Sequence, residues 1–343
     1  MKNITFREAL REALNEEMKK DNSVFVMGED VGIYGGVFKI TEGLINTFGK
    51  ERVRNTPISE SAIVGLATGA AMMGSRPVAE IMYIDFCTMA MDPIVNQAAK
   101  VIYETSGKIK VPLVIRTQGG IANSNGSTQS QSLEAWFCHT PGLKVVMPSN
   151  PYDAKGLLKT AIIDDNPVMF IEHKSLYGII GEIPEEEYYI KFGEANIVKE
   201  GKDATIIAVS RSVHFAMEAA KILEDEEIQV EIIDPRTLVP LDIETIINSV
   251  KKTNRVLVVH EGHLSFGIGA EIGSQIYENV FDFLDAPIKR LGGADVPIPF
   301  SPKLESASIP SANDIVKGII EKKLKVKRVQ RSVDDLHTVH VRL

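Results

Sequence analysis

The feature of this sequence that most constrains its fold is an alternation of apolar, strand-like runs with stretches of helical periodicity. Strand-like runs occupy residues 24–27, 77–82, 112–116, 144–147 and 167–172. Helical stretches occupy residues 60–73, 85–103 and 152–163. Strands that alternate with helices pair in parallel, because each crossover helix returns the chain to the same edge of the sheet. The pattern therefore predicts a mostly parallel sheet with helices on both faces.

A second unit of the same kind follows a segment that breaks the pattern. Residues 178–193 contain Pro184 and four acidic residues without clear periodicity, so we interpret them as a domain linker. Beyond them, strands are expected at 204–210, 230–234 and 255–260, and helices at 212–223, 242–250 and 268–279. We therefore predict an α/β fold with two parallel-sheet domains, residues 1–185 and 195–325. The remaining residues, 326–343, are expected to be either a flexible tail or a segment that docks a partner.

Composition excludes several classes of protein. A formal net charge of −8 does not suit a nucleic-acid-binding protein, which needs a basic face to neutralise phosphates. No 18-residue apolar run is present that could span a membrane. The first residues resemble an amphipathic helix with a Thr5–Glu8 capping box rather than a signal peptide. The two cysteines, Cys87 and Cys138, lack metal-binding spacing and indicate reduced, cytoplasmic surroundings.

The segment from residue 56 to residue 80 carries the first candidate site. Ser59 is expected to cap a helix that begins at Glu60 and is crowded with glycine, alanine and serine. Glycine inside a helix costs about 1 kcal/mol relative to alanine, so it is best tolerated where another backbone or a ligand approaches closely. Glu60 is therefore either a functional carboxylate or an ordinary acid in a first helical turn, where the helix dipole favours it.

The run TQGGIANSNGSTQSQ, residues 117–131, is the second candidate. It follows a predicted strand and is too long for a simple connector, so it is interpreted as an active-site loop or, alternatively, as a flexible surface loop. The sequence contains no dinucleotide fingerprint, Walker sequence, HExxH helix or GxSxG elbow.

Several long segments together resemble one family, the β subunits of the thiamine diphosphate-dependent first component of 2-oxo acid dehydrogenase complexes. The matching segments are MGEDVG at 27–32, TPISESAIVGLATGAAMMGSRPVAE at 56–80, NQAAK at 96–100, PGLKVVMPSNPYDAKGLL at 141–158, DPRTLVPLD at 234–242, KTNRVLVVHEG at 252–262 and LDAPIKRLGGADVPIPFSP at 284–302. The resemblance implies a pyrimidine-binding domain followed by a transketolase C-terminal-like domain. It also implies decarboxylation of pyruvate or a branched-chain 2-oxo acid, or cleavage of acetoin, with acyl transfer to lipoamide.

The resemblance assigns roles to individual residues. Glu60, after Pro-Ile-Ser, matches the glutamate that bonds the aminopyrimidine ring and favours the imino tautomer, which then deprotonates the thiazolium carbon. Ile58 and Phe86 match residues beside that ring, although Phe86 could also be an ordinary core residue. Four residues match a monovalent-cation site that orders a loop in some relatives, with potassium as the candidate ion: Leu113, Ala161, Asp164 and Asn166. The alternative for this segment is an exposed loop at the end of a helix.

One departure concerns the glycine-rich loop. The family has HSQS where this chain has QSQS, so Gln129 stands in place of a histidine. Glutamine cannot carry a proton near neutral pH, whereas histidine can. This departure leaves open whether Gln129 changes the efficiency, the substrate or the activity itself.

The sequence also predicts partners. No GDG motif is present, so the resemblance implies that a separate α subunit holds the diphosphate through Mg²⁺, in an α2β2 heterotetramer that serves a lipoyl-bearing acyltransferase core. The predicted activity is that of an oxidoreductase that works only with its α subunit. Two alternatives remain: half of a split transketolase-like enzyme, and a non-catalytic scaffold subunit.

Overall fold

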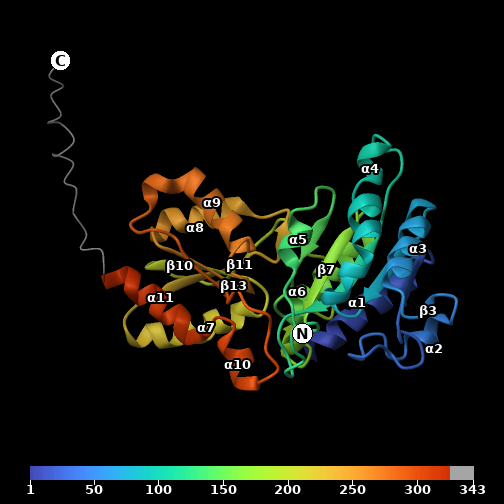
Figure 1. Ribbon diagram of the computed structural model, residues 1–343, viewed down its shortest axis with the longest axis horizontal. Coiled ribbons are helices and arrows are strands. Elements are labelled where there is room, and N and C mark those ends of the chain that lie inside the picture. The colour runs from blue at the N-terminus through green and yellow to red at the C-terminus, as the bar shows by residue number, and fades with distance from the viewer. Residues whose placement is uncertain (325–343) are drawn as a thin grey trace, which may run out of the picture.

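The computed structural model describes residues 1–324, and the predicted tail at 326–343 lies outside them. Two α/β domains lie side by side, the first drawn from blue to green and the second from yellow to red in Figure 1. The first contains β1 (Lys2–Thr5), α1 (Phe6–Lys20), β2 (Val24–Gly28), α2 (Leu44–Phe48), β3 (Val53–Asn55), α3 (Glu60–Met72), β4 (Arg76–Ile81), the 3₁₀ helix η1 (Ile84–Ala90), the π-helix η2 (Asp92–Ala98), α4 (Val101–Glu104), β5 (Val114–Gly119), α5 (Glu134–Cys138), β6 (Lys144–Val146), α6 (Pro151–Ile163), β7 (Val168–His173), the 3₁₀ helix η3 (Lys174–Leu176) and β8 (Ile180–Ile183).

The second domain continues the alternation of strands and helices. It contains β9 (Asn196–Lys199), β10 (Ala204–Ala208), α7 (Ser212–Asp225), β11 (Val230–Asp234), β12 (Thr237–Val239), α8 (Ile243–Thr253), β13 (Val256–His263), α9 (Ile268–Val280), the 3₁₀ helix η4 (Phe281–Phe283), β14 (Lys289–Gly293), α10 (Pro302–Ala307) and α11 (Ala312–Leu324). Each predicted strand of this unit is present, and 230–234 is reproduced residue for residue as β11.

The first domain is built around a seven-stranded sheet. Its order is β12-β6-β7-β5-β4-β2-β3, and all neighbouring strands run parallel except β12, which is antiparallel to β6. Side chains alternate between the two faces, as a strand requires. Phe170 of β7 packs on the side of α1 and α6, and Met169 packs on the side of α3, η1 and η2. The predicted α/β class is confirmed, with one antiparallel edge strand added to the parallel sheet.

The second domain repeats this layered plan on a smaller sheet. Its five strands are ordered β14-β13-β10-β11-β9, with only β9 antiparallel to its neighbour. Ile206 and Ile232 face α7 and α11, whereas Ile207 and Ile233 face α8 and α9. The central strands β10 and β11 are buried along their whole length, because helices cover both faces of the sheet.

Two predictions from the sequence are wrong in detail. Residues 85–103 do not form one regular helix but the succession η1, η2 and α4, in which Pro93 lacks the N–H that a regular helix needs at that position. The expected linker is not wholly irregular, because Ile180–Ile183 forms β8 and pairs antiparallel with β1. The Thr5–Glu8 capping box at the start of α1 is confirmed.

One strand joins the two domains. β12 lies in the second domain along the chain but adds to the edge of the first domain's sheet, beside β6. Arg236, just before it, pairs with the buried Asp153 of α6 at 2.7 Å. The second domain is therefore attached to the first by backbone hydrogen bonds and a buried ion pair as well as by the connecting chain. None of the helices within residues 1–324 has the length and apolar composition needed to cross a bilayer.

Candidate active site

The predicted catalytic and cofactor-binding residues lie in segments that begin at the carboxyl edge of the first domain's sheet. Strands β2, β3, β4, β5 and β7 run parallel, so the segments that leave them all begin at this edge. In parallel α/β sheets, ligands bind at such edges because the loops there are free to carry polar groups. The segments that begin there lead to Glu29, Glu60, Phe86, Gln129 and Lys174.

Glu60 is the first residue of α3 and is half-buried. Within residues 1–324, no group forms a hydrogen bond or an ion pair with its carboxylate. Ser59 precedes the helix as predicted, but its side chain makes no capping bond, so that part of the prediction is wrong. Ile58 is 81% exposed. This chain by itself therefore presents the carboxylate and an apolar neighbour without enclosing them.

A second unbonded acid, Glu29, lies near Glu60. Burial, together with the negative charges of Glu60, Asp30 and Glu80, raises the pKa of Glu29. Glu29 is not among the residues predicted from the sequence, although its place directly after an apolar strand was a usable signal. Glu80 differs from both acids, because its carboxylate pairs with Arg116.

The pairing of Glu80 belongs to a buried charge network beneath this edge. Arg116 donates to Glu80 and to Glu172, each at 2.7 Å, and Tyr177 donates to Glu172 at 2.6 Å. Burial raises the pKa of Glu172, an effect that Arg116 opposes. The network is closed by its own partners, whereas Glu29 and Glu60 have no bonded partner within residues 1–324 and can meet a ligand.

Phe86 lies in η1 beside the glycine-rich loop. Its ring centroid is 6.2 Å from that of Tyr83. The neighbouring Asp85 accepts hydrogen bonds from the backbone N–H and the side-chain amide of Gln131, at 3.2 and 2.8 Å. The structure thus brings the end of the 120–131 loop against the segment that carries Phe86.

Gln129 is held by its backbone rather than by its side chain. Its carbonyl oxygen accepts a hydrogen bond from the Lys174 ammonium, which also lies 5.0 Å from the centre of the Tyr83 ring. Burial lowers the pKa of Lys174, while Asp85, Glu261 and Glu305 oppose this effect. Sequence reasoning missed Lys174, because its significance depends on a loop 45 residues away along the chain.

The residues of the predicted cation site lie beside one another where α6 ends and β7 begins. The backbone N–H of Val168 donates to the carbonyl of Leu113 at 2.8 Å, and Asn166 donates to the Asp164 carboxylate at 2.8 Å. Ala161 is buried one turn earlier in α6. Lys144 bonds the Asp164 carboxylate, and Arg76 donates to the Asp164 carbonyl at 3.1 Å. Two cationic side chains thus already occupy Asp164, so the residues as arranged do not fit an added potassium ion.

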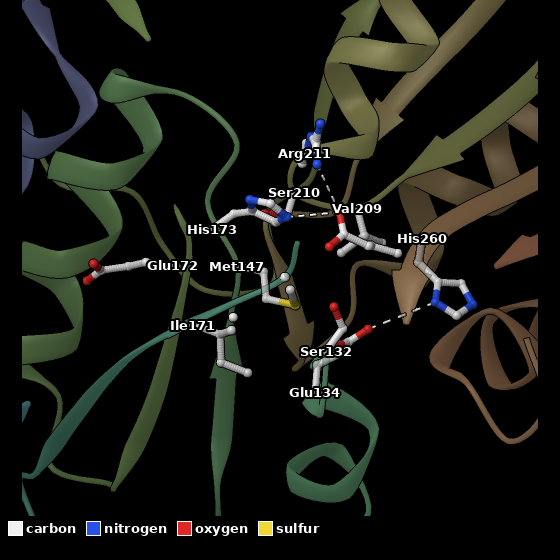
Figure 2. Close-up of a pocket in the computed structure, with 13 residues that line it drawn as sticks. Ser132, Glu134, Met147, Ile171, Glu172, His173, Val209, Ser210, Arg211 and His260 are labelled. Carbon is white, nitrogen blue, oxygen red and sulfur yellow. Dashed lines mark hydrogen bonds and ion pairs between the residues drawn. The ribbon is translucent and has the colours of Figure 1, made fainter. Parts of the chain in front are cut away.

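A small internal cavity lies where the two domains meet. It is lined by the ends of β5, β7, β10 and β13, and its volume of about 20 Å³ suffices for a single water. Figure 2 shows Glu134 and His260 approaching each other across it, with Glu172 turned away. The Glu134 carboxylate and His260 Nδ1 are 3.9 Å apart, and both ring nitrogens of His260 lack a partner among the described residues.

Burial sets the protonation of this pair. It raises the pKa of Glu134 to about 7, helped by the charge of Glu261, and it lowers the pKa of His260 to about 4. Near pH 6 both groups are therefore neutral. No cluster of three or more His, Cys, Asp or Glu suited to a metal ion is found within residues 1–324.

Comparison with known proteins shows which family has this architecture. The transketolase pyrimidine binding domain matches residues 2–179, and the transketolase C-terminal domain matches residues 193–315. The pyruvate dehydrogenase E1 component subunit beta of Rickettsia felis is 48% identical over 316 residues, covering 92% of this chain and 97% of that protein. This chain belongs to the E1 β-subunit family. The resemblance read from the sequence is thereby confirmed.

Another member of the family and one solved structure extend the comparison. The E1 β subunit of Oryza sativa subsp. japonica named "beta-2, mitochondrial" is 47% identical, over 92% of this chain and 85% of that protein. The structure of a split-gene transketolase, described as an inactive beta4 tetramer, superposes with a TM-score of 0.76 at 24% identity, over 93% of this chain and 98% of that one. At that identity the likeness establishes the fold alone.

Proposed function

We propose that this chain is the β subunit of a thiamine diphosphate-dependent 2-oxo acid dehydrogenase of the pyruvate type. The observation that carries the proposal is Glu60, a carboxylate without a partner at the carboxyl edge of the sheet, with Ile58 exposed beside it. Buried or half-buried charges are ordinarily paired, so an unpaired one at a ligand-binding edge indicates a group that meets its partner in the assembled enzyme.

The residues present suit the aminopyrimidine half of the cofactor. Glu60 would hold a proton at the ring nitrogen, and Phe86 and Ile58 would flank the flat ring. When bound, the cofactor supplies the electron sink for decarboxylation. Glu29 lies close enough to Glu60 for the Glu60 charge to help raise the pKa of Glu29.

The exposed face of α3 supports a partner subunit. A side-chain carbon placed on Gly65 or Gly69 would meet nothing within 4 Å, so no contact within residues 1–324 explains either glycine. Leu66 and Met73, on the same outward face, are 65% and 86% exposed. Glycines beside exposed apolar residues permit close approach of another chain, which we propose is an α subunit that holds Mg²⁺ and the diphosphate in an α2β2 heterotetramer.

The finer chemistry follows from the family. The acyl group would pass to lipoamide on an acyltransferase core, which makes the assembled enzyme an oxidoreductase. Gln129 provides an amide where a titratable histidine was expected, so any proton transfer during acyl transfer must use another group, such as the nearby Lys174. Pyruvate is favoured by the relatives, and acetoin and branched-chain 2-oxo acids remain candidates. The cytoplasmic location remains a prediction.

The experiment is co-expression of the full chain with candidate α chains that contain a GDG motif. The purified complex would be assayed with pyruvate, branched-chain 2-oxo acids and acetoin, using a lipoyl domain as acceptor. We expect decarboxylation of one 2-oxo acid only when both chains and thiamine diphosphate are present. Cofactor binding without turnover of any of these substrates would favour a scaffold subunit, and turnover of a sugar phosphate would favour a split transketolase.

A further inference from the structure

The 120–131 loop, which carries Gln129, is fixed at two ends by two different domains. Its far end is held within the first domain, where Lys174 bonds the Gln129 carbonyl and Asp85 accepts from Gln131. Its near end is held by the second domain. The backbone N–H of Ile121 donates to a carboxylate oxygen of Glu261 at 2.5 Å, although the two residues are 140 positions apart.

Glu261 lies at the boundary between the two domains and contacts side chains from both of them. Its other oxygen is 2.9 Å from His173 Nε2, at the end of β7 in the first domain. Arg211, which follows β10 in the second domain, lies 3.7 Å from the same carboxylate and donates to the Ile121 carbonyl at 3.5 Å. Figure 2 shows His173 and Arg211 converging on this point, with dashed lines marking the hydrogen bond from His173 and the ion pair with Arg211.

The charge state of Glu261 suits this role. Burial acts to raise its pKa, but the charges of His173 and Arg211, the hydrogen bond to His173 and the N–H of Ile121 together hold the pKa below its usual value. The carboxylate is therefore ionised near neutral pH. A hydrogen bond from a backbone N–H to an ionised, buried acceptor is among the stronger kinds found in proteins.

The backbone at the start of the loop is tightly enclosed, and only glycine fits at residue 120. Gly120 has a φ of +79°, and a side-chain carbon there would lie 2.1 Å from His173 Nε2 and 2.8 Å from the bonded oxygen of Glu261. Asn123 and Ser124 also adopt positive φ values, of 58° and 54°. Such conformations persist only where surrounding contacts enforce them, and Glu305 of the second domain accepts from the Ser124 N–H at 3.2 Å.

From these contacts we infer that Glu261 is a positioning residue for the active site: the second domain uses it to fix the loop that carries Gln129. The inference rests on the proposed function only in treating that loop as part of the active site. The second domain thus contributes to catalysis through the geometry of the first domain, in addition to any role in assembly.

The test compares Glu261→Ala and Glu261→Gln with a matched control, Glu231→Ala. Glu231 is also a buried acid of the second domain, and it also accepts a backbone N–H, from Gly201 at 3.3 Å, and pairs with a cation, Lys252. It lies on β11, in a network that does not include the loop. Hydrogen exchange of residues 121–131 would be measured on the full chain, and kcat and KM on the chain assembled with its α subunit.

We expect the loop amides of Glu261→Ala to exchange about 10- to 100-fold faster, the factor for losing a hydrogen bond to a charged group. Its kcat should fall by up to about 100-fold, because small misplacements of catalytic groups are costly, with a smaller change in KM. Glu261→Gln, which keeps an acceptor for Ile121, should recover part of both losses. Gly120→Ala should reproduce the loop effect while leaving Glu261 in the chain.

Unchanged loop exchange in Glu261→Ala would overturn the inference, as would equal loop effects in Glu231→Ala. The exchange measurement decides the matter even if the assembled wild-type enzyme turns over no 2-oxo acid. A wild-type enzyme that turns over no 2-oxo acid would refute the proposed function. The role of Glu261 in fixing the loop would then be tested by hydrogen exchange alone. If Glu261→Ala does not fold, Glu261→Gln and Gly120→Ala provide the same comparison.

Discussion

The two domains share one layered plan but differ in what lies at the carboxyl edges of their parallel strands. In the first domain, part of that edge is open, and Glu29 and Glu60 have no bonded partner within residues 1–324. In the second domain, the acids at the ends of the strands are hydrogen-bonded to other groups of the chain. Asp234 at the end of β11 accepts from Ser149 at 2.5 Å, and Glu261 at the end of β13 is bonded as described above.

The carboxyl edges of the two sheets therefore have different roles. An edge with unpaired charges can receive a ligand, whereas an edge whose charges are paired across a boundary fixes one domain against the other. Substitutions at the closed edge should therefore change the stability of the chain. Substitutions at the open edge should change its activity and assembly.

The largest effect on stability is expected from Arg236→Met at the closed edge. Arg236 lies 2.7 Å from Asp153, and burial raises the pKa values of both Asp153 and Asp234, which Arg236 opposes. Removing the cation leaves two buried acids without a compensating charge. We expect a loss of about 3–5 kcal/mol in the free energy of unfolding, measured by urea denaturation.

The matched substitution at the open edge is Glu60→Gln. Because its carboxylate has no partner in the chain, we expect the free energy of unfolding to change by less than about 0.5 kcal/mol. A loss comparable to that of Arg236→Met would show that the two edges do not differ in the way described.

An intermediate effect, dependent on pH, is expected from Glu134→Gln in the cavity between the domains. The folded chain holds a proton on Glu134 up to about pH 7, whereas the unfolded chain releases it near the ordinary value of 4.5. Between these values the unfolded state binds fewer protons, so Glu134 lowers stability as the pH rises. Glutamine cannot titrate, and the variant should gain up to about 3 kcal/mol relative to wild type between pH 4.5 and 7.5.

The measurement is the difference in unfolding free energy between variant and wild type, taken at several pH values. His260 acts in the opposite direction, because its lowered pKa makes stability rise with pH between about 4 and 6.5. Taking the difference cancels that contribution wherever His260 behaves alike in both proteins. A difference that does not vary with pH would show that Glu134 is ionised in the folded chain.

A small effect on stability, and the largest on assembly, is expected at Gly69 on α3. Gly69→Ala should stabilise the isolated chain by about 0.5–1 kcal/mol, because the position is open and alanine favours helix. Gly69→Leu should leave the chain folded but block association with the α subunit, measured by size-exclusion chromatography. If Gly69→Leu assembles normally, the α subunit does not bind at this face of α3.

Much of the fold was predictable, because the local signals agreed with the final structure. The strand β11, which is rich in valine and isoleucine, and the helix that begins at Glu60 could both be predicted from residue patterns. β12 could not be predicted in the same way. It has three residues, precedes Pro240, and pairs with a strand some 90 residues earlier in the chain.

The candidate site was only partly predictable for a similar reason. Glu60, Phe86 and Gln129 were selected from segments that resemble a family, and their roles remain proposals. Glu261 and Lys174 act through contacts with residues 140 and 45 positions away, and no local pattern reveals such contacts. At Ser59 the local pattern predicted a contact that does not form. Serine is a favourable capping residue, but its backbone conformation here does not suit a capping bond.

The most direct test of the account is the turnover of Glu60→Gln in the assembled enzyme. The account predicts that kcat for the preferred 2-oxo acid falls by about 10²- to 10⁴-fold, the usual contribution of a positioned acid or base, while the variant folds and assembles normally. If the variant keeps turnover within about threefold of wild type, an effect of less than about 1 kcal/mol, Glu60 is not the group that activates the cofactor.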